Sequence, residues 1–562
     1  MNSMKYSLSQ LFGIACLALL PQLASAQLDP AAQAAVDRVL ADFKDPNRPA
    51  LAIAVISKGS LIYQQAFGQA SLEYKVPATV DTRFHVDKLA WEVIAFAILK
   101  LEQEGKVSLS DDVRTYLPAL PDFGKPISIN HLLSSTDGLH SYRILHALTG
   151  AKPTEAGQKA GLPDYIKRQR QANFTPGQAY SSIADTRFLV LQKLVEVVTG
   201  QSFDAYCKEQ LFEPLGMSNT LFASAAPLSN LATPYSGDPK TGYSPSHGER
   251  GAAAYASLYS SIRDMATWKR HVLSHGLAKK LHGALRLDDG TPIRSASGAT
   301  IYGQQHEGKE RGIPKQFQTG SHGGYASTSI RFPEQDFSVI VLSSGLAYNG
   351  AYGMRLAFLF LEKHFTEAET IDFTKIEAAK LSAAQLQNIQ GSYWSPLAAQ
   401  ATKIHLKDNV LHYSRPGAEW EILPLSAALL QLKIPSDDKF LLQLTEGRDG
   451  RQMKLSVTGS DPVVFNAYQP ASYTKAELAQ FTGTFFNRDL NTMIELVETD
   501  GVLTARNLHI GTVNFAPVHG DIFTGDKNFL SGLKFIRTGH AVSSFQILVD
   551  GARNLEFTKL RS

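Results

Sequence analysis

Between about residues 30 and 365, some segments show the hydrophobic periodicity of helices and others that of strands. Residues 51–67 hold two β-rich apolar runs on either side of a Lys-Gly pair, which is the pattern of a hairpin. Residues 92–104 are apolar almost all round, as in a helix buried inside a domain. The run at 338–342 is typical of a buried strand, and 351–364 of a helix covering it. This part of the chain is therefore predicted to be a mixed α/β domain.

A different pattern begins after a polar stretch near residues 366–374. Strand-like runs separated by Gly, Asn and Asp replace the long helical patterns. The new region repeats itself at a constant offset of 92 residues, which relates Gly391 to Gly483, Asp408 to Asp500 and Phe465 to Phe557. Each copy has a short leading helix and about six to eight strands, which predicts two small antiparallel, lipocalin-like β-barrels.

The first 26 residues have the pattern of a cleavable signal peptide. Lys5 precedes an apolar stretch at 11–23, and Ala24-Ser25-Ala26 supplies a small-residue cleavage site. We therefore expect export to the periplasm or out of the cell, and no transmembrane segment, because no later run is long enough. The predicted order is a signal peptide at 1–26, an α/β domain at 27–370, and barrels at 375–470 and 471–562.

The composition excludes several classes of function. The 55 basic and 52 acidic residues nearly balance and form no basic block, so nucleic acid is not an expected partner. Cys16 would be removed with the signal peptide, which leaves Cys207 as a small buried residue of a helix at 203–212. The histidines show no metal-binding spacing and there is no phosphate-binding glycine motif, so no metal or cofactor is predicted. His131 and His140 are expected at the surface or in turns.

Several motifs resemble those of the serine β-lactamase, penicillin-binding-protein and D-aminopeptidase family. They lie at residues 81–105, 131–139, 211–220, 259–268 and 331–334. The resemblance covers most of residues 35–345. It implies an antiparallel sheet flanked by helices, with a helical subdomain around residues 110–250. D-aminopeptidases of this family also carry barrels after the hydrolase domain, which implies that the barrels here shape or cover the cleft.

The resemblance also implies where the catalytic residues should be. In the family, a helix opens with Ser-x-x-Lys, and the serine is acylated while the lysine and a tyrosine move protons. In this sequence Lys88 lies at the serine position and Trp91 at the lysine position. Residues three apart share a helix face, so the two side chains keep the geometry of the pair without its chemistry.

The other two family motifs are only partly kept. The Tyr-x-Asn motif should follow Pro176-Gly177, and two registers compete because the segment has one extra residue. The positions are Ser182 and Ala184 in one register and Ile183 and Asp185 in the other, while Tyr180 lies two residues too early to serve as base. The family's His-x-Gly motif, on the far wall of the cleft, corresponds to His322 and Gly324.

Each surviving cleft residue has two interpretations. Lys88 is either a desolvated nucleophile or, as we favour, a half-exposed lysine paired with Asp87 or Glu92, because an amide formed on lysine would not turn over. Trp91 either offers a stacking face and an N–H group to a ligand or fills the space of the missing pair. His322 is expected to be a hydrogen-bonded wall residue, since no activated nucleophile remains for it to assist.

Three hypotheses for the function follow. The first is an exported pseudoenzyme that binds a peptide, acyl-amide or peptidoglycan-like ligand in the old cleft. The second is an active hydrolase, peptidase or acyltransferase with a rewired centre, in which Lys88, Tyr180 or Ser182 acts with His322. In the third, the paired barrels carry an interaction function and the N-terminal domain is a scaffold.

Overall fold

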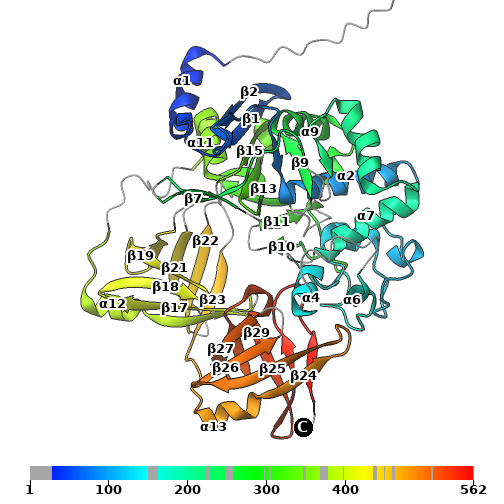
Figure 1. The fold of residues 1–562 in the computed structure, drawn as a ribbon. Coiled ribbons are helices and arrows are strands. Elements are labelled where there is room, and N and C mark those ends of the chain that lie inside the picture. Colours follow the sequence, from blue (N-terminus) through cyan, green and yellow to red (C-terminus); the bar gives the residue numbers. More distant parts are fainter. Residues whose placement is uncertain are drawn as a thin grey trace, which may run out of the picture.

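The computed structural model describes most of residues 28–560 and contains a sheet-and-helix domain followed by two closed barrels (Figure 1). The predicted fold class is therefore confirmed. The predicted signal peptide and residues 368–377 lie outside the described residues. The described ranges are 28–149, 163–181, 183, 185–222, 228–239, 241–246, 257–295, 298–302, 305–345, 350–367, 378–396, 398–434, 440–447, 450–457, 462–507 and 511–560.

An antiparallel sheet of eight strands forms the middle of the first domain, in the order β10-β11-β12-β13-β14-β15-β1-β2. The predicted hairpin is β1 and β2, and its turn holds Lys58 and Gly59 at φ angles of 49° and 71°, as hairpin turns require. Strand β1 also pairs with β15, near the end of the domain. The bounds are β1 Leu51–Ser57, β2 Ser60–Phe67, β10 Arg294–Ser295, β11 Gly298–Ile301, β12 Gln305–Glu310, β13 Ile313–His322, β14 Tyr325–Phe332 and β15 Phe337–Ser343.

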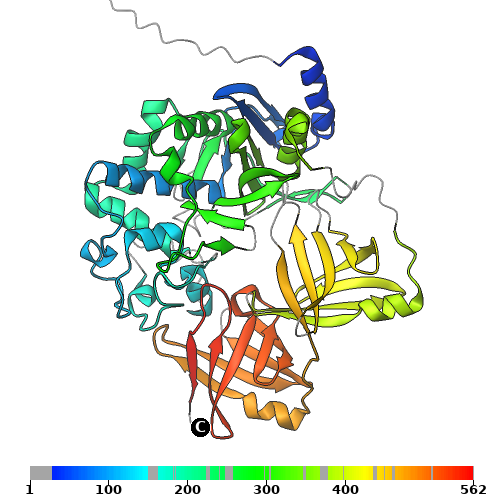
Figure 2. The same ribbon diagram turned by 180° about the vertical axis from the view of Figure 1, so that it is seen from behind.

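Different helices cover the two faces of this sheet (Figures 1 and 2). Alternate residues of β1 from Leu51 to Val55 pack with α1 and α11, and those from Ala52 to Ile56 pack with α2 and α9. Both faces of the strand are buried, as its nearly continuous apolar sequence predicts. The four helices are α1 Pro30–Val39, α2 Ala90–Gln103, α9 Ile262–Ser274 and α11 Gly350–Leu361.

Helix α2 is the predicted buried helix, and it carries a charged residue into the core. The Glu92 side chain is 4% exposed and accepts hydrogen bonds from Lys269 Nζ at 2.8 Å and Trp268 Nε1 at 3.1 Å. Although burial raises it, the charges of Lys269 and His282 hold the pKa of Glu92 well below its ordinary value. The ion pair therefore fixes α2 to α9.

A subdomain of short helices packs on the other side of α2, with α7 directly against it. The region also contains a strand pair, β7 and β8, so it is less purely helical than the resemblance implies. The expected helix at 203–212 changes to a π-helical turn after Cys207, which is fully buried as predicted. The elements are α3 Ile129–Ser134, α4 Tyr142–Thr149, α6 Asp164–Lys167, α7 Thr186–Thr199, α8 Phe203–Cys207, β7 Tyr235–Asp238 and β8 Gly242–Pro245.

Each predicted repeat folds into a closed eight-stranded barrel. Both begin with a short helix whose capping box uses equivalent residues, Ser382 and Thr474. The first barrel comprises α12 Ala383–Ile389, β16 Gly391–Ser395, β17 Gln400–Lys407, β18 Val410–Arg415, β19 Ala418–Pro424, β20 Leu429–Leu432, β21 Phe440–Gly447, β22 Gly450–Val457 and β23 Val463–Tyr468. The second comprises α13 Lys475–Leu478, β24 Gly483–Asn487, β25 Thr492–Thr499, β26 Val502–Asn507, β27 Gly511–His519, β28 Ile522–Gly525, β29 Gly532–Thr538, β30 Ala541–Ile547 and β31 Glu556–Lys559.

The second barrel is docked onto the helical subdomain (Figures 1 and 2). Ile144, Leu145 and Leu148 of α4 belong to the same apolar cluster as the interior of this barrel. Polar contacts surround that cluster, including an Arg170–Asp489 ion pair at 2.7 Å. Apolar burial of this kind holds the two parts together as one unit.

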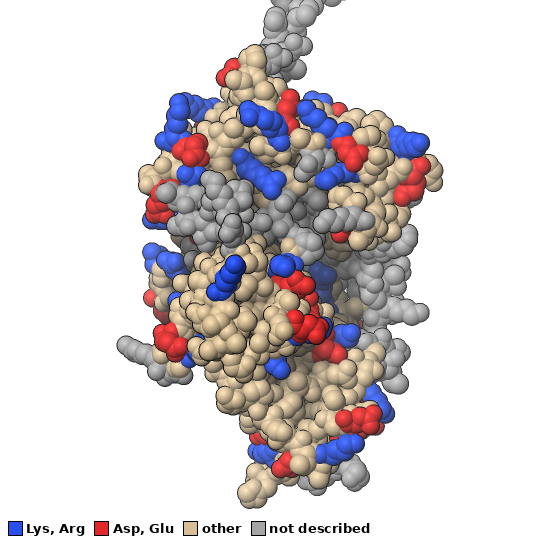
Figure 3. All heavy atoms as spheres, turned by 90° about the vertical axis from the view of Figure 1, so that its left-hand side faces the viewer, with Lys and Arg blue, Asp and Glu red and all other residues tan. Residues whose placement is uncertain are grey.

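Acidic and basic side chains are interspersed over the face of the molecule shown in Figure 3. Among the described helices, none is both long and apolar enough to cross a membrane.

We expect Leu145→Ala to destabilise the docked state by about 2–5 kcal/mol, because it leaves a cavity between α4 and the second barrel. Leu359→Ala, on the half-exposed side of α11, is the control and should cost less than about 1 kcal/mol. Chemical denaturation measures both values. Equal effects of the two substitutions would contradict the docking role of α4.

Candidate functional site

The candidate site lies where helix α2 begins beside the central sheet. A single turn of 3₁₀ helix, Asp87–Leu89, leads into α2, and strand β5 (Arg83–His85) precedes it. Strand β5 pairs with β9 (Leu258–Ser261). The start of the helix is therefore positioned by a strand pair as well as by the core.

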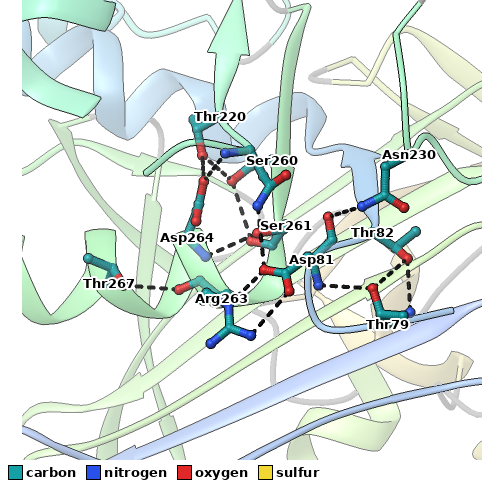
Figure 4. A network of polar contacts seen from close by, with 11 residues as sticks. Thr79, Asp81, Thr82, Thr220, Asn230, Ser260, Ser261, Arg263, Asp264 and Thr267 are labelled. Carbon is teal, nitrogen blue, oxygen red and sulfur yellow. Dashed lines mark hydrogen bonds and ion pairs between the residues drawn. The ribbon is translucent and has the colours of Figure 1, made fainter. Parts of the chain in front are cut away.

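A polar network anchors this strand pair (Figure 4). The Asp264 carboxylate accepts hydrogen bonds from Thr220 Oγ1 and from the N–H of Asn219, each at 2.8 Å. Arg263 Nε donates to Asp81 at 2.7 Å, just ahead of β5. Burial raises the pKa of Asp264, as expected for a carboxylate held by neutral donors in the interior. This network is structural, because its groups bond to one another.

Trp91, which the resemblance assigns to the position of the family's lysine, is buried in the core beside α7. Its side chain is 7% exposed, and its ring stacks on Phe188 of α7 with centroids 4.5 Å apart and planes 15° apart. Its Nε1 is buried without a hydrogen-bond partner. Of the two interpretations of Trp91, the packing favours the one in which the indole fills the space of the missing pair.

Lys88, at the nucleophile position, is exposed. Its ammonium lies 5.4 Å from the centre of the Trp91 ring, in cation–π range. The predicted pairing with Asp87 or Glu92 is wrong: Glu92 bonds to Lys269, and the Asp87 carboxylate accepts the backbone N–H of Ser321 at 2.9 Å. Lys88 is therefore a surface cation over an aromatic ring, and not a desolvated nucleophile.

The Tyr-x-Asn candidates do not form a proton-transfer pair in the described part of the chain. Ser182 and Ala184 lie outside the described residues. Burial raises the pKa of Tyr180 to about 12, so its hydroxyl holds its proton at neutral pH. Ile183 is 46% exposed. The buried Asp185 carboxylate accepts a hydrogen bond from Ser141 Oγ at 2.9 Å, which places it in the packing around α7.

His322 lies at the end of β13, with its ring centre 4.7 Å from that of His85. Burial and the neighbouring His322 lower the pKa of His85 to about 3, so His85 is a neutral support for His322. A Cβ on Gly324 would lie 2.9 Å from the carbonyl oxygen of Tyr235, on the other side of the turn from the helix. His322 is thus on the strand expected for it, whereas Gly324 lies in the turn between β13 and β14 and packs against Tyr235 and not against the start of α2.

Gly320 is the residue of β13 that meets the helix. A Cβ there would lie 2.8 Å from the backbone nitrogen of Lys88 and 2.9 Å from Asp87 Oδ2. Sequence reasoning missed Gly320, and it considered Asp87 only as a partner for Lys88. An Asp before a helix reads as an ordinary cap, and nothing in the sequence signals that its side chain turns toward β13.

The second barrel reaches the same region through the turn between β30 and β31. A Cβ on Gly551 would lie 3.5 Å from that of Ile183 and 3.2 Å from that of Ser141, and the Ser141 N–H donates to the Gly551 carbonyl. Asp550 also contributes to the raised pKa of Tyr180, after the larger effect of burial. The barrel turn therefore contacts Ile183, one of the candidate positions for the Tyr-x-Asn motif.

His131 and His140 are both buried, so their predicted surface positions are wrong. His131 Nε2 lies 3.0 Å from Asp288. His140 Nε2 lies 3.1 Å from the carbonyl oxygen of Arg553 in the barrel turn. These partners come from far along the chain, which is why local sequence could not reveal the burial. Among the described residues, no group of three His, Cys, Asp or Glu side chains is placed to hold a metal ion.

Comparison with known proteins identifies the family. A family model described as Beta-lactamase matches residues 36–361, and the chain belongs to the beta-lactamase family. The D-aminopeptidase of Brucella anthropi is 26% identical over 277 residues, which are 48% of this chain and 52% of that protein. The D-aminopeptidase of Brucella canis is 26% identical over 268 residues, 47% and 50% of the two chains. The chain thus spans about half the length of the curated relatives it matches.

A solved structure shares the fold. The octameric penicillin-binding protein homologue from Pyrococcus abyssi matches with a TM-score of 0.52 and 20% identity, over 78% of this chain and 99% of that one. The resemblance to the β-lactamase and penicillin-binding-protein family is therefore confirmed.

The buried His140 predicts a pH-dependent loss of stability. Burial lowers its pKa from 6.5 to about 4, so between these values the unfolded chain binds a proton that the folded chain excludes. Stability should therefore fall as the pH falls through this window, by at most about 3 kcal/mol from this residue. His140→Gln should flatten the dependence, whereas the exposed His540→Gln should not. Parallel curves of melting temperature against pH for all three proteins would refute the assignment.

Proposed function

We propose that this chain is a non-catalytic member of the beta-lactamase family that binds a peptide-like or acyl-amide ligand at the rim of the old catalytic cleft. The observation that carries the proposal is the burial of Trp91, stacked on Phe188, at the position of the family's lysine. An indole N–H is a donor only and cannot take a proton from a nucleophile.

The remaining groups do not rebuild a catalytic pair. Lys88 presents its ammonium to solvent over the indole ring, and the hydroxyl of Tyr180 keeps its proton because its pKa is about 12. Asp185 is engaged with Ser141. Loss of a serine nucleophile alone costs many orders of magnitude in rate, because the other groups then have no covalent step to support.

Two features support this class of ligand: the D-aminopeptidase relatives and the exposed Lys88. D-aminopeptidases are among the relatives, which supports a peptide, acyl-amide or peptidoglycan-like ligand. The exposed ammonium of Lys88 offers a charged contact for a carboxylate or carbonyl oxygen. Export by the predicted signal peptide to the periplasm or beyond would place the protein where cell-wall peptides occur.

The second candidate function is a rewired hydrolase, peptidase or acyltransferase. The observation that favours it is the position of His322, whose ring centre lies 4.7 Å from that of His85 at the end of β13, since histidine is the side chain that most often serves as a general base. Its nucleophile would have to be Ser182, which lies outside the described residues, or Tyr180.

The third candidate places the function in the barrels. Against an independent role for the second barrel stands its docking on α4. Its interior is also filled by apolar and aromatic side chains, among them Phe485, Phe535 and Phe545. We therefore assign this barrel to the same functional unit as the cleft.

A fluorescent fluorophosphonate and a fluorescent penicillin separate the first two candidates. We expect no covalent label on the full chain, under conditions that label an active serine β-lactamase completely, because the proposal includes no activated serine. Mass spectrometry of the intact protein after the reaction measures the fraction that carries a label. A label on any serine would refute the non-catalytic proposal, and its loss in Ser182→Ala would identify the nucleophile.

Ligand binding is tested with a D-alanyl-D-alanine peptide as a peptidoglycan-like probe. We expect Lys88→Ala to weaken binding by about tenfold or more, the value of one hydrogen bond to a charged group. The exposed Lys279→Ala in α10 (Ala278–Leu281) is the charge-matched control and should bind like the unmodified chain. Calorimetry measures all three. Identical binding by the three proteins would exclude Lys88 from the ligand site.

A further inference from the structure

Strand β13 and the 3₁₀ turn that leads into α2 approach each other unusually closely. Gly320 brings the backbone of the strand so near to the helix that a Cβ would lie 2.8 Å from the Lys88 nitrogen. No side chain fits between the two elements. The groups that face each other here are therefore backbone groups and the side chain of Asp87.

Asp87 adopts a conformation that serves this contact. Its φ angle is +42°, in the left-handed region that favours glycine and tolerates Asp better than most residues. Its own N–H donates to His85 Nδ1 at 3.2 Å. In this conformation the carboxylate turns onto β13, where Oδ2 accepts the N–H of Ser321 at 2.9 Å.

The contact blocks a donor that a ligand would otherwise reach. Ser321 is exposed at the end of β13, so without Asp87 its N–H would face solvent beside Lys88. Backbone N–H groups beside a helix start are good partners for carbonyl and carboxylate oxygens. A carboxylate attached to the same chain is present at a high effective concentration and competes with any such ligand.

We infer that Asp87 is an internal competitor, whose carboxylate occupies the Ser321 N–H and keeps ligand oxygens out of the cleft floor. The inference rests on the proposed function for the location of the ligand. It adds that the protein in its present state holds ligands at the rim, by Lys88, and not at the floor. The floor accepts a carboxylate or carbonyl oxygen only when Asp87 is removed or displaced.

Three variants test this inference. Asp87→Gly removes the carboxylate and suits the left-handed backbone, and Asp87→Asn removes the charge but keeps an acceptor oxygen for Ser321. Asp336→Gly is the matched control, because Asp336 has a φ of +43° and is exposed in a turn between β14 and β15. Circular dichroism and melting temperatures establish that each variant is folded.

The first measurement is hydrogen exchange of the peptide 313–322. Within this peptide, Asp87→Gly should speed the exchange of the Ser321 N–H by about tenfold or more, because that N–H loses its acceptor. Asp87→Asn and Asp336→Gly should exchange like the unmodified chain. Unchanged exchange in a folded Asp87→Gly protein would overturn the inference.

The second measurement is calorimetric binding of hippurate, which has both an acyl-amide and a carboxylate. Asp87→Gly should bind it at least about tenfold more tightly than the unmodified chain, and Asp336→Gly should not. Equal binding by Asp87→Gly and the unmodified chain would overturn the competitor role. Failure of the non-catalytic proposal is a separate result, because it would appear as covalent labelling of a serine in the unmodified chain.

Discussion

Helix α2 lies between the central sheet and the helical subdomain, where contacts with β13, α9 and α7 hold it. Its first turn is fixed against β13 by the Gly320 contact and the Asp87–Ser321 hydrogen bond. Its next turn is fixed to α9 by the Glu92–Lys269 ion pair. Trp91 stacks on α7. Because the helix contributes to the core of both layers, the geometry of the cleft depends on its position.

These restraints fix the start of α2 through packing and through contacts with neighbouring elements. The buried ion pair and the ring stack form whether or not a nucleophile is present. Packing therefore restricts the volume of the side chain at this position more than its chemical type. An indole at the lysine position satisfies the volume constraint by packing on Phe188. In the proposed register, an indole at this position would not supply the proton acceptor that the family's reaction requires.

The barrels show how a repeated sequence acquires unequal surroundings. The two copies share the 92-residue offset, the capping helices and the eight-stranded closure. The second copy also takes up the apolar face of α4 and places its β30–β31 turn against Ser141 and Ile183. The second barrel therefore packs against the N-terminal domain through contacts that the described part of the first barrel does not make with α4.

The local sequence was sufficient to predict the main helices and strands and to show that the Ser-x-x-Lys residues are absent. The hairpin at Lys58-Gly59, the all-apolar helix after Lys88 and the barrel repeats follow from periodicity, turn residues and spacing, which act over a few residues. The absence of a serine and a lysine at positions 88 and 91 is visible from the sequence alone.

Only the tertiary structure determined which partners those residues have. Glu92 pairs with Lys269, Asp87 with Ser321, and His140 with Arg553, over separations of 177, 234 and 413 residues. The stacking of Trp91 on Phe188 likewise depends on the tertiary structure. Charges and rings interact through space, and the distances between such groups are set by how the layers pack, which no local pattern in the sequence records.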